Sequence, residues 1–170
     1  ISSLTTPPRD RLPIETRVMP LSRIDDVVAG LSRSMAQGAR TYWVCPLVEE
    51  SEESDATAAV ERFEALKQNF GHKVDLVHGR MTTIEKDKAL NGFRDGTSRV
   101  LVATTVVEVG VDVPDATIMV IEHAERFGLA QLHQLRGRVG RGDQASTCVL
   151  LYKGPLSETA HARLAILRET

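Results

Sequence analysis

Short apolar runs alternate with amphipathic stretches along most of the chain. The apolar runs are rich in β-branched residues, which favours strands, and the stretches between them carry apolar residues at helical spacing, as in Ile24, Val27, Val28, Leu31 and Met35. We expect strands at residues 14–19, 41–48, 73–78, 99–103, 117–121 and 146–152. We expect helices at residues 22–37, 55–70, 82–93, 129–139 and 157–167.

This alternation predicts an α/β fold. Apolar strands linked by helices imply a mostly parallel sheet with helices on both faces, which is a three-layer α/β/α sandwich, over residues 14–156. Residues 1–13 are rich in proline and are interpreted as a linker, and residues 157–170 as a C-terminal helix that leaves the domain. Ligands bind beyond the carboxyl ends of such strands, so functional residues should follow Val48, His78, Ala103, Ile121 and Tyr152.

Composition narrows the range of functions. Hydrophobic residues make up 42% and charged residues 26% of the 170 residues, as in a single folded domain rather than a disordered chain. No apolar run approaches the roughly 18 residues that a membrane span needs, so we expect a cytoplasmic protein with no membrane partner. Cys45 and Cys148 are interpreted as buried core thiols, and the five histidines have no metal-ligand spacing, so no metal site is expected.

The usual signature of an ATP-binding domain is missing from the sequence. The pattern G-x-x-x-x-G-K-[ST] does not occur, and no lysine follows a glycine. Residues 118–122, IMVIE, resemble an acid-ended strand that holds magnesium, but without a phosphate loop before it we favour a core strand. The chain by itself is therefore not expected to hydrolyse ATP by the usual route.

The stretch QLRGRVGRG, residues 134–142, carries the strongest chemical signal. Gln134, Arg138 and Arg141 stand at i, i+4 and i+7, which places them on one helical face, and the glycines allow the helix to end. Two converging guanidinium groups repel each other unless an anion is bound, and a triphosphate in its transition state is such an anion. A generic basic patch for nucleic acid is the alternative interpretation.

Three ordered motifs resemble those of superfamily 2 helicases. QLRGRVGR is similar to the motif VI pattern Q-x-x-G-R-x-x-R, ATTVVEVGVDVP at 103–114 resembles motif V, and VHGRM at 77–81 resembles motif IVa. The block AERFGLAQLHQLRGRVGRG is typical of the RecG-like translocases and the transcription-repair coupling factors, and YWVCPLVEES at 42–51 favours the RecG-like group. The resemblance covers essentially the whole chain and implies a RecA-like helicase C-terminal domain of the P-loop NTPase type.

The resemblance implies roles for individual residues at a nucleotide. Arg138 and Arg141 would reach the γ-phosphate of an ATP held by the first motor domain, with Gln134 in support. The motif V stretch would supply the nucleotide-binding residues Glu108, Gly110 and Asp112. In that role Asp112 would accept a hydrogen bond from the ribose and Gly110 would let the backbone approach the nucleotide, although a cap for the following turn explains Asp112 equally well.

The resemblance also implies contacts with the DNA backbone. The expected DNA-binding residues follow strands and are His78, Gly79, Arg80, Thr104 and Thr105. Hydroxyls and backbone N–H groups can hold phosphates, and a turn motif is the alternative for the two threonines. With four Phe, two Tyr and one Trp, base stacking is a poor candidate for the main grip, so backbone tracking along a duplex is favoured.

Taken as a whole, the resemblance implies an ATP-dependent motor that remodels branched double-stranded DNA in repair and recombination. The expected partners are that DNA and the first RecA-like domain and wedge domain of the same chain, in a monomer. ATP and Mg²⁺ would be bound mainly by the first motor domain, and this fragment alone would be inactive. The alternatives are the motor of a transcription-repair coupling factor, an RNA helicase, and a binding module of helicase fold without motor function.

Overall fold

The computed structural model describes residues 14–36, 38–45, 52–78, 81–104, 117–136, 146–153 and 158–169. Within these ranges, the strands are β1 (Ile14–Pro20), β2 (Thr41–Cys45), β3 (Val74–Val77), β4 (Val100–Thr104), β5 (Ile118–Ile121) and β6 (Ser146–Tyr152). The α-helices are α1 (Ile24–Ala36), α2 (Glu52–Phe70), α3 (Thr83–Asp95), α4 (Leu129–Arg136) and α5 (Glu158–Glu169). Short 3-10 turns η2 (Leu21–Arg23), η3 (Gly71–Lys73) and η4 (Ala124–Arg126) precede α1, β3 and α4.

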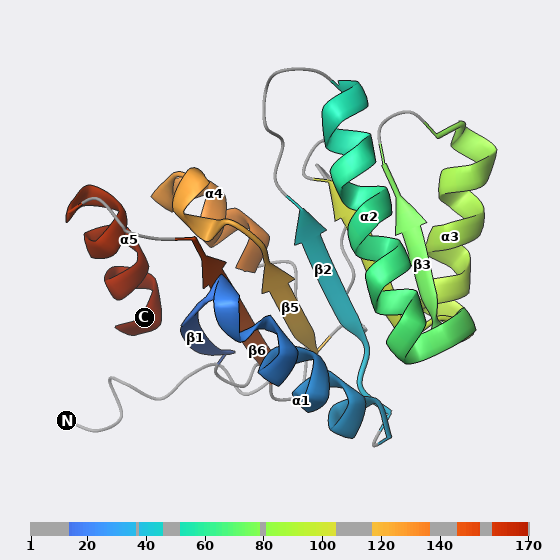
Figure 1. Ribbon diagram of the computed structural model, residues 1–170, viewed down its shortest axis with the longest axis horizontal. Helices are drawn as coiled ribbons and strands as arrows, with labels where there is room; N and C mark the ends of the chain where they lie inside the picture. The colour runs from blue at the N-terminus through green and yellow to red at the C-terminus, as the bar shows by residue number, and fades with distance from the viewer. Residues whose placement is uncertain are drawn as a thin grey trace, which may run out of the picture.

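The strands form one sheet in the order β1-β6-β5-β2-β4-β3 (Figure 1). Every pairing between them is parallel. A parallel neighbour cannot be reached through a tight turn. In the described part of the chain, helices α1, α2, α3 and α4 each connect one strand to the next. The predicted three-layer α/β/α sandwich is confirmed, and its sheet is parallel at every described pairing.

Side chains of the central strand β2 alternate between two buried layers. Tyr42 and Val44 join the layer beneath α3, α4 and α5, which contains Phe93, Leu132 and Leu164. Trp43 and Cys45 join the layer beneath α1 and α2, which contains Leu31 and Leu66. Figure 1 shows α1 and α2 in front of the sheet. Because both faces are covered, the central strand β2 is buried at every position and is apolar from Tyr42 to Cys45.

Helix α3 shows how local sequence fixes an element's limits. Thr82 caps its first turn, since the Thr82 hydroxyl accepts from the Glu85 backbone N–H over 3.2 Å and the Thr82 backbone N–H donates to the Glu85 carboxylate over 2.9 Å. The bond from the Thr82 backbone, together with one from its hydroxyl, lowers the pKa of Glu85 below its usual value. At the other end Gly96 adopts a left-handed conformation with φ of 87°, which glycine accommodates without strain.

Most expected elements lie within a few residues of their predicted positions. Helix α2 begins at Glu52, before the predicted residue 55, and acidic residues in the first turn of a helix favour that start because they face its positive end. The predicted continuations of β2 to 48 and of α4 to 139 lie outside the described residues. Cys45 and Cys148 are buried, as expected. Among the described helices, none is long and apolar enough to cross a membrane.

Candidate functional site

The carboxyl ends of the parallel strands meet at one edge of the sheet, which lies toward the top of Figure 1. The register places Cys45 beside Thr104, and Ile121 beside both Val44 and Leu150. Neighbouring strands are roughly 4.8 Å apart, so the ends of β6, β5, β2, β4 and β3 span roughly 20 Å along this edge. In the chain, the expected residues at 79–80 and 105–112 follow the carboxyl ends of β3 and β4.

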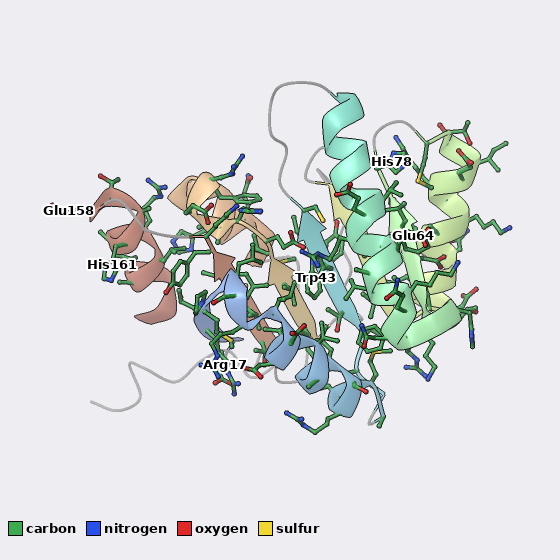
Figure 2. The ribbon with its side chains drawn as sticks, in the orientation of Figure 1. Arg17, Trp43, Glu64, His78, Glu158 and His161 are labelled. Carbon is green, nitrogen blue, oxygen red and sulfur yellow. The ribbon has the colours of Figure 1, made fainter. Side chains whose placement is uncertain are left out.

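Two of the expected DNA-binding residues have described positions on this edge. His78 directly follows β3 and is half-buried (Figure 2), and Thr104 is the last residue of β4. Val77 pairs with Ala103, and His78 and Thr104 are the residues that directly follow this pair. The His78 carbonyl accepts from the Met81 backbone N–H over 3.2 Å, which turns the chain toward α3. The structure therefore brings motifs IVa and V together at their first residues.

Gln134 lies exposed on α4, the helix that leads into the two arginines. The chain before it is firmly packed, because Ala124, Phe127 and Leu132 are all buried in the core. The Leu132 backbone N–H donates to the carbonyl of Gly128 over 3.0 Å and forms the first turn of the helix. The remaining expected residues lie outside the described part of the chain: Gly79, Arg80, Thr105, Glu108, Gly110, Asp112, Arg138 and Arg141.

Glu125 joins the ends of β5 and β6 ahead of α4. Its Oε1 accepts from the Lys153 backbone N–H over 2.9 Å, and its carbonyl accepts from Arg163 Nη2 of α5 over 3.0 Å. His123 Nδ1 lies 3.4 Å from Glu125 Oε2, and the His123 backbone is left-handed with φ of 52°. A non-glycine residue holds that conformation only where its surroundings favour it. The turn before α4 is thus held by contacts from the end of β6 and from α5.

Glu122, immediately after β5, lies at the topological switch point of the sheet. The chain leaves β2 for α2 on one face, and it leaves the adjacent β5 for α4 on the opposite face. The Glu122 backbone N–H donates to the Val44 carbonyl over 3.0 Å. Its Oε1 accepts from Trp43 Nε1 over 2.9 Å and from Arg62 Nε of α2. Oε1 of this carboxylate therefore accepts from two protein donors on neighbouring elements.

This cluster was hard to predict from the sequence. Arg62 and Glu122 are separated by 60 positions, and the acid-ended pattern at 118–122 did not indicate Arg62 as a partner of Glu122. The available signals were an acidic residue closing an apolar run and the presence of one tryptophan in the chain. Within the described residues there is no group of three or more His, Cys, Asp or Glu side chains that could hold a metal ion.

Comparison with known proteins assigns the family. Residues 22–143 match the model described as the helicase conserved C-terminal domain. The chain belongs to this family. This helicase domain is 52% identical over 171 residues to the ATP-dependent DNA helicase RecG of Acidithiobacillus ferridurans, covering 100% of the chain and 25% of that protein. It is also 52% identical to RecG of Escherichia coli K12 over 165 residues, covering 96% of the chain and 24% of that protein.

Solved structures agree with this assignment. A RecG structure bound to a three-way DNA junction matches with a TM-score of 0.78 and 41% identity, covering 96% of this domain and 21% of that chain. The C-terminal domain of the DEAD-box protein Dbp5 matches with a TM-score of 0.62 at 21% identity, covering 92% and 84% of the two chains, and shows the fold alone. The helicase domain thus spans about a quarter of the length of the curated relatives it matches.

Proposed function

We propose that this domain is the second motor domain of an ATP-dependent helicase that remodels branched double-stranded DNA. The observation that carries the proposal is the 52% identity to RecG over the whole chain, together with the likeness to RecG bound to a three-way junction. The RecG relatives are about four times as long, which leaves room for a first motor domain and a wedge domain in the same protein.

In this motor the domain supplies arginines to an ATP held by its neighbour. Arg138 and Arg141 stabilise the charge that develops on the γ-phosphate, and Gln134 supports them. The packing of Ala124, Phe127 and Leu132 favours this role, because a catalytic arginine must be positioned accurately and the helix before it must therefore be rigid. The nucleotide also meets Glu108, Gly110 and Asp112.

Mg²⁺ is held mainly by the first motor domain in this proposal. The best acidic candidate here is Glu122, which follows an apolar strand, but its Oε1 already accepts two hydrogen bonds from protein donors. A magnesium ion needs free carboxylate oxygens and several waters. The donor set described in this domain therefore does not fit a magnesium site.

The DNA backbone runs along the carboxyl edge beside His78 and Thr104. The adjacency of these two residues supports a shared contact, because strands one step apart can reach neighbouring phosphates of one DNA strand. Gly79, Arg80 and Thr105 complete this surface. The RecG relatives favour a branched duplex over the RNA polymerase complex on which a coupling factor acts.

The test is made in a full-length RecG chain that carries this domain. Arg138→Ala and Arg141→Ala should each lower kcat for ATP hydrolysis by about 10³ or more while junction binding is retained, as for arginine fingers elsewhere. Arg23→Ala is the matched control, because Arg23 forms an exposed ion pair with Asp26 and is not one of the expected site residues. Normal hydrolysis with lost junction binding would instead assign the two arginines to DNA.

A second arm uses the isolated domain. It should show negligible ATP hydrolysis and weak junction binding that falls with rising salt, since phosphate contacts release counterions. Robust hydrolysis by the isolated domain that Arg141→Ala abolishes would contradict the division of labour between two motor domains.

A further inference from the structure

The two helices on the α1/α2 face meet the sheet mainly through apolar side chains, with a charged exception beneath α2. Arg62 stands on α2 between Ala59 and Leu66, which are both buried, so it lies toward the sheet. Its Nε donates to Glu122 Oε1, and the side chains of Arg62 and Glu122 are only 26% and 8% exposed. A leucine at position 62 would be enough to pack α2 against the sheet, so the guanidinium group of Arg62 requires another explanation.

The three side chains close a triangle. Trp43, with no exposed surface, donates from Nε1 to the same Glu122 oxygen over 2.9 Å. The guanidinium carbon of Arg62 lies 5.7 Å from the centroid of the Trp43 ring, within the range of a cation–π contact. Figure 2 places Trp43 on β2 near the middle of the molecule. Each member therefore contacts the other two, and they come from α2, β2 and the residue after β5.

Directional bonds do what apolar packing cannot. The free energy of apolar contact depends mainly on the buried area and has no preferred direction, so it constrains the position of a helix along an apolar sheet surface only weakly. Hydrogen bonds weaken steeply as their angle departs from linearity, so a bond from α2 to Glu122 fixes the helix along and around its axis. Buried polar groups of this kind can specify one arrangement of packed elements over its close alternatives.

The location gives this constraint a functional meaning. The cluster lies at the switch point between β2 and β5, on the edge from which the nucleotide and DNA segments leave the sheet. The backbone bond from Glu122 to Val44 extends the β2–β5 pairing to that edge. A motor transmits force between its ATP and its DNA through elements that must keep their relative positions.

We propose that Arg62, Glu122 and Trp43 form a positioning network that locks α2 to the β2 and β5 ends, and that this lock couples ATP hydrolysis to movement on branched DNA. The inference rests on the proposed function of the domain. None of the three residues touches ATP or DNA in this role, so they are positioning residues. Loss of this network should lower the number of junctions unwound per ATP hydrolysed, while hydrolysis itself continues.

The experiment compares junctions unwound per ATP consumed in a full-length RecG chain that carries this domain. Glu122→Gln keeps the size and the acceptor for Trp43 but removes the charge, and Arg62→Met keeps the aliphatic stem but removes the cation. Arg23→Met is the matched control, because it makes the same chemical change in an exposed pair with Asp26. All assays run well below the melting temperature, with the folded fraction measured by circular dichroism.

Both network variants should lower the number of junctions unwound per ATP by roughly 3- to 30-fold, the range expected for residues that carry coupling without contacting a ligand. Turnover of ATP per folded molecule should stay close to that of the control. Arg62→Lys should fall between Arg62→Met and the wild type, because it restores the charge without the planar donor.

An unchanged ratio in the folded variants would overturn the positioning role and leave the network as a stabilising contact only. If Arg62→Met does not fold, Glu122→Gln decides, since it disturbs the core least. A wild-type chain that consumes ATP but unwinds no junction would overturn the proposed function itself, and the coupling role with it.

Discussion

Replacing Arg62 by Met should expose how much the domain depends on its internal ion pair. The change leaves the Glu122 carboxylate, whose side chain is 8% exposed, without its cation. Breaking a buried pair from one side costs about 3–5 kcal/mol, and because water reaches the 26% exposed Arg62 side chain we expect about 2–4 kcal/mol here. For a domain of this size that loss lowers Tm by roughly 5–15 °C.

The double variant Arg62→Met/Glu122→Met distinguishes pairing from packing. Once both charges are gone, the remaining penalty is the Trp43 N–H, which loses its acceptor at a cost of about 1–3 kcal/mol. The double variant should therefore lose less stability than the two single variants added together, by about 0.5–3 kcal/mol. Arg23→Met, which removes an exposed partner of Asp26, should change stability by only about 0–1 kcal/mol.

Urea denaturation of the 170-residue domain, followed by far-ultraviolet circular dichroism, measures the wild type, Arg62→Met, Glu122→Met, the double variant and Arg23→Met. A common slope against urea would establish that the variants unfold from equally compact native states. Additive losses in the double variant, or an Arg62→Met no less stable than Arg23→Met, would refute the idea that the buried pair is coupled.

The other predictions concern helix limits and pH. Thr82→Ala removes the cap of α3 and should cost about 1 kcal/mol in urea denaturation, whereas Thr83→Ala one residue later should have a smaller effect. The pKa of Glu85 is lowered in the folded state, so its ionised carboxylate stabilises the fold above the usual pKa of 4.5, and this stabilisation is lost as the pH falls through the folded-state pKa. The Tm values of the wild type and Glu85→Gln should therefore converge in acid. A difference in Tm that does not change with pH would contradict this. Gly96→Ala should destabilise the domain by roughly 1–2 kcal/mol because the φ of Gly96 is positive. Gly30→Ala, inside α1, should stabilise it by about 0.5–1 kcal/mol, because the added Cβ would meet only Arg33 Nη2 at 3.8 Å. The same sign for both variants would be inconsistent with the backbone argument.

The pattern of apolar positions determined the elements and the fold class. The inner strands β2 and β5 are mostly buried and mostly apolar, and helix α1 shows its buried side at helical spacing. Short-range chemistry was also readable, since the α3 cap depends on residues three apart. The motifs that resemble helicases led to the family that the comparison then showed. The roles of Arg138 and Arg141 remain predictions.

The order of the strands was decided by tertiary structure. Nothing local places β5 between β6 and β2, because that arrangement depends on how every crossover helix packs on the sheet. The same is true of Glu122. Its sequence context suited a metal-binding strand end or a core strand, and its actual partners, Trp43 and Arg62, lie 79 and 60 residues away in the sequence. Charges separated by such distances along the chain interact only once the fold brings them together, so only the folded chain could reveal their pairing.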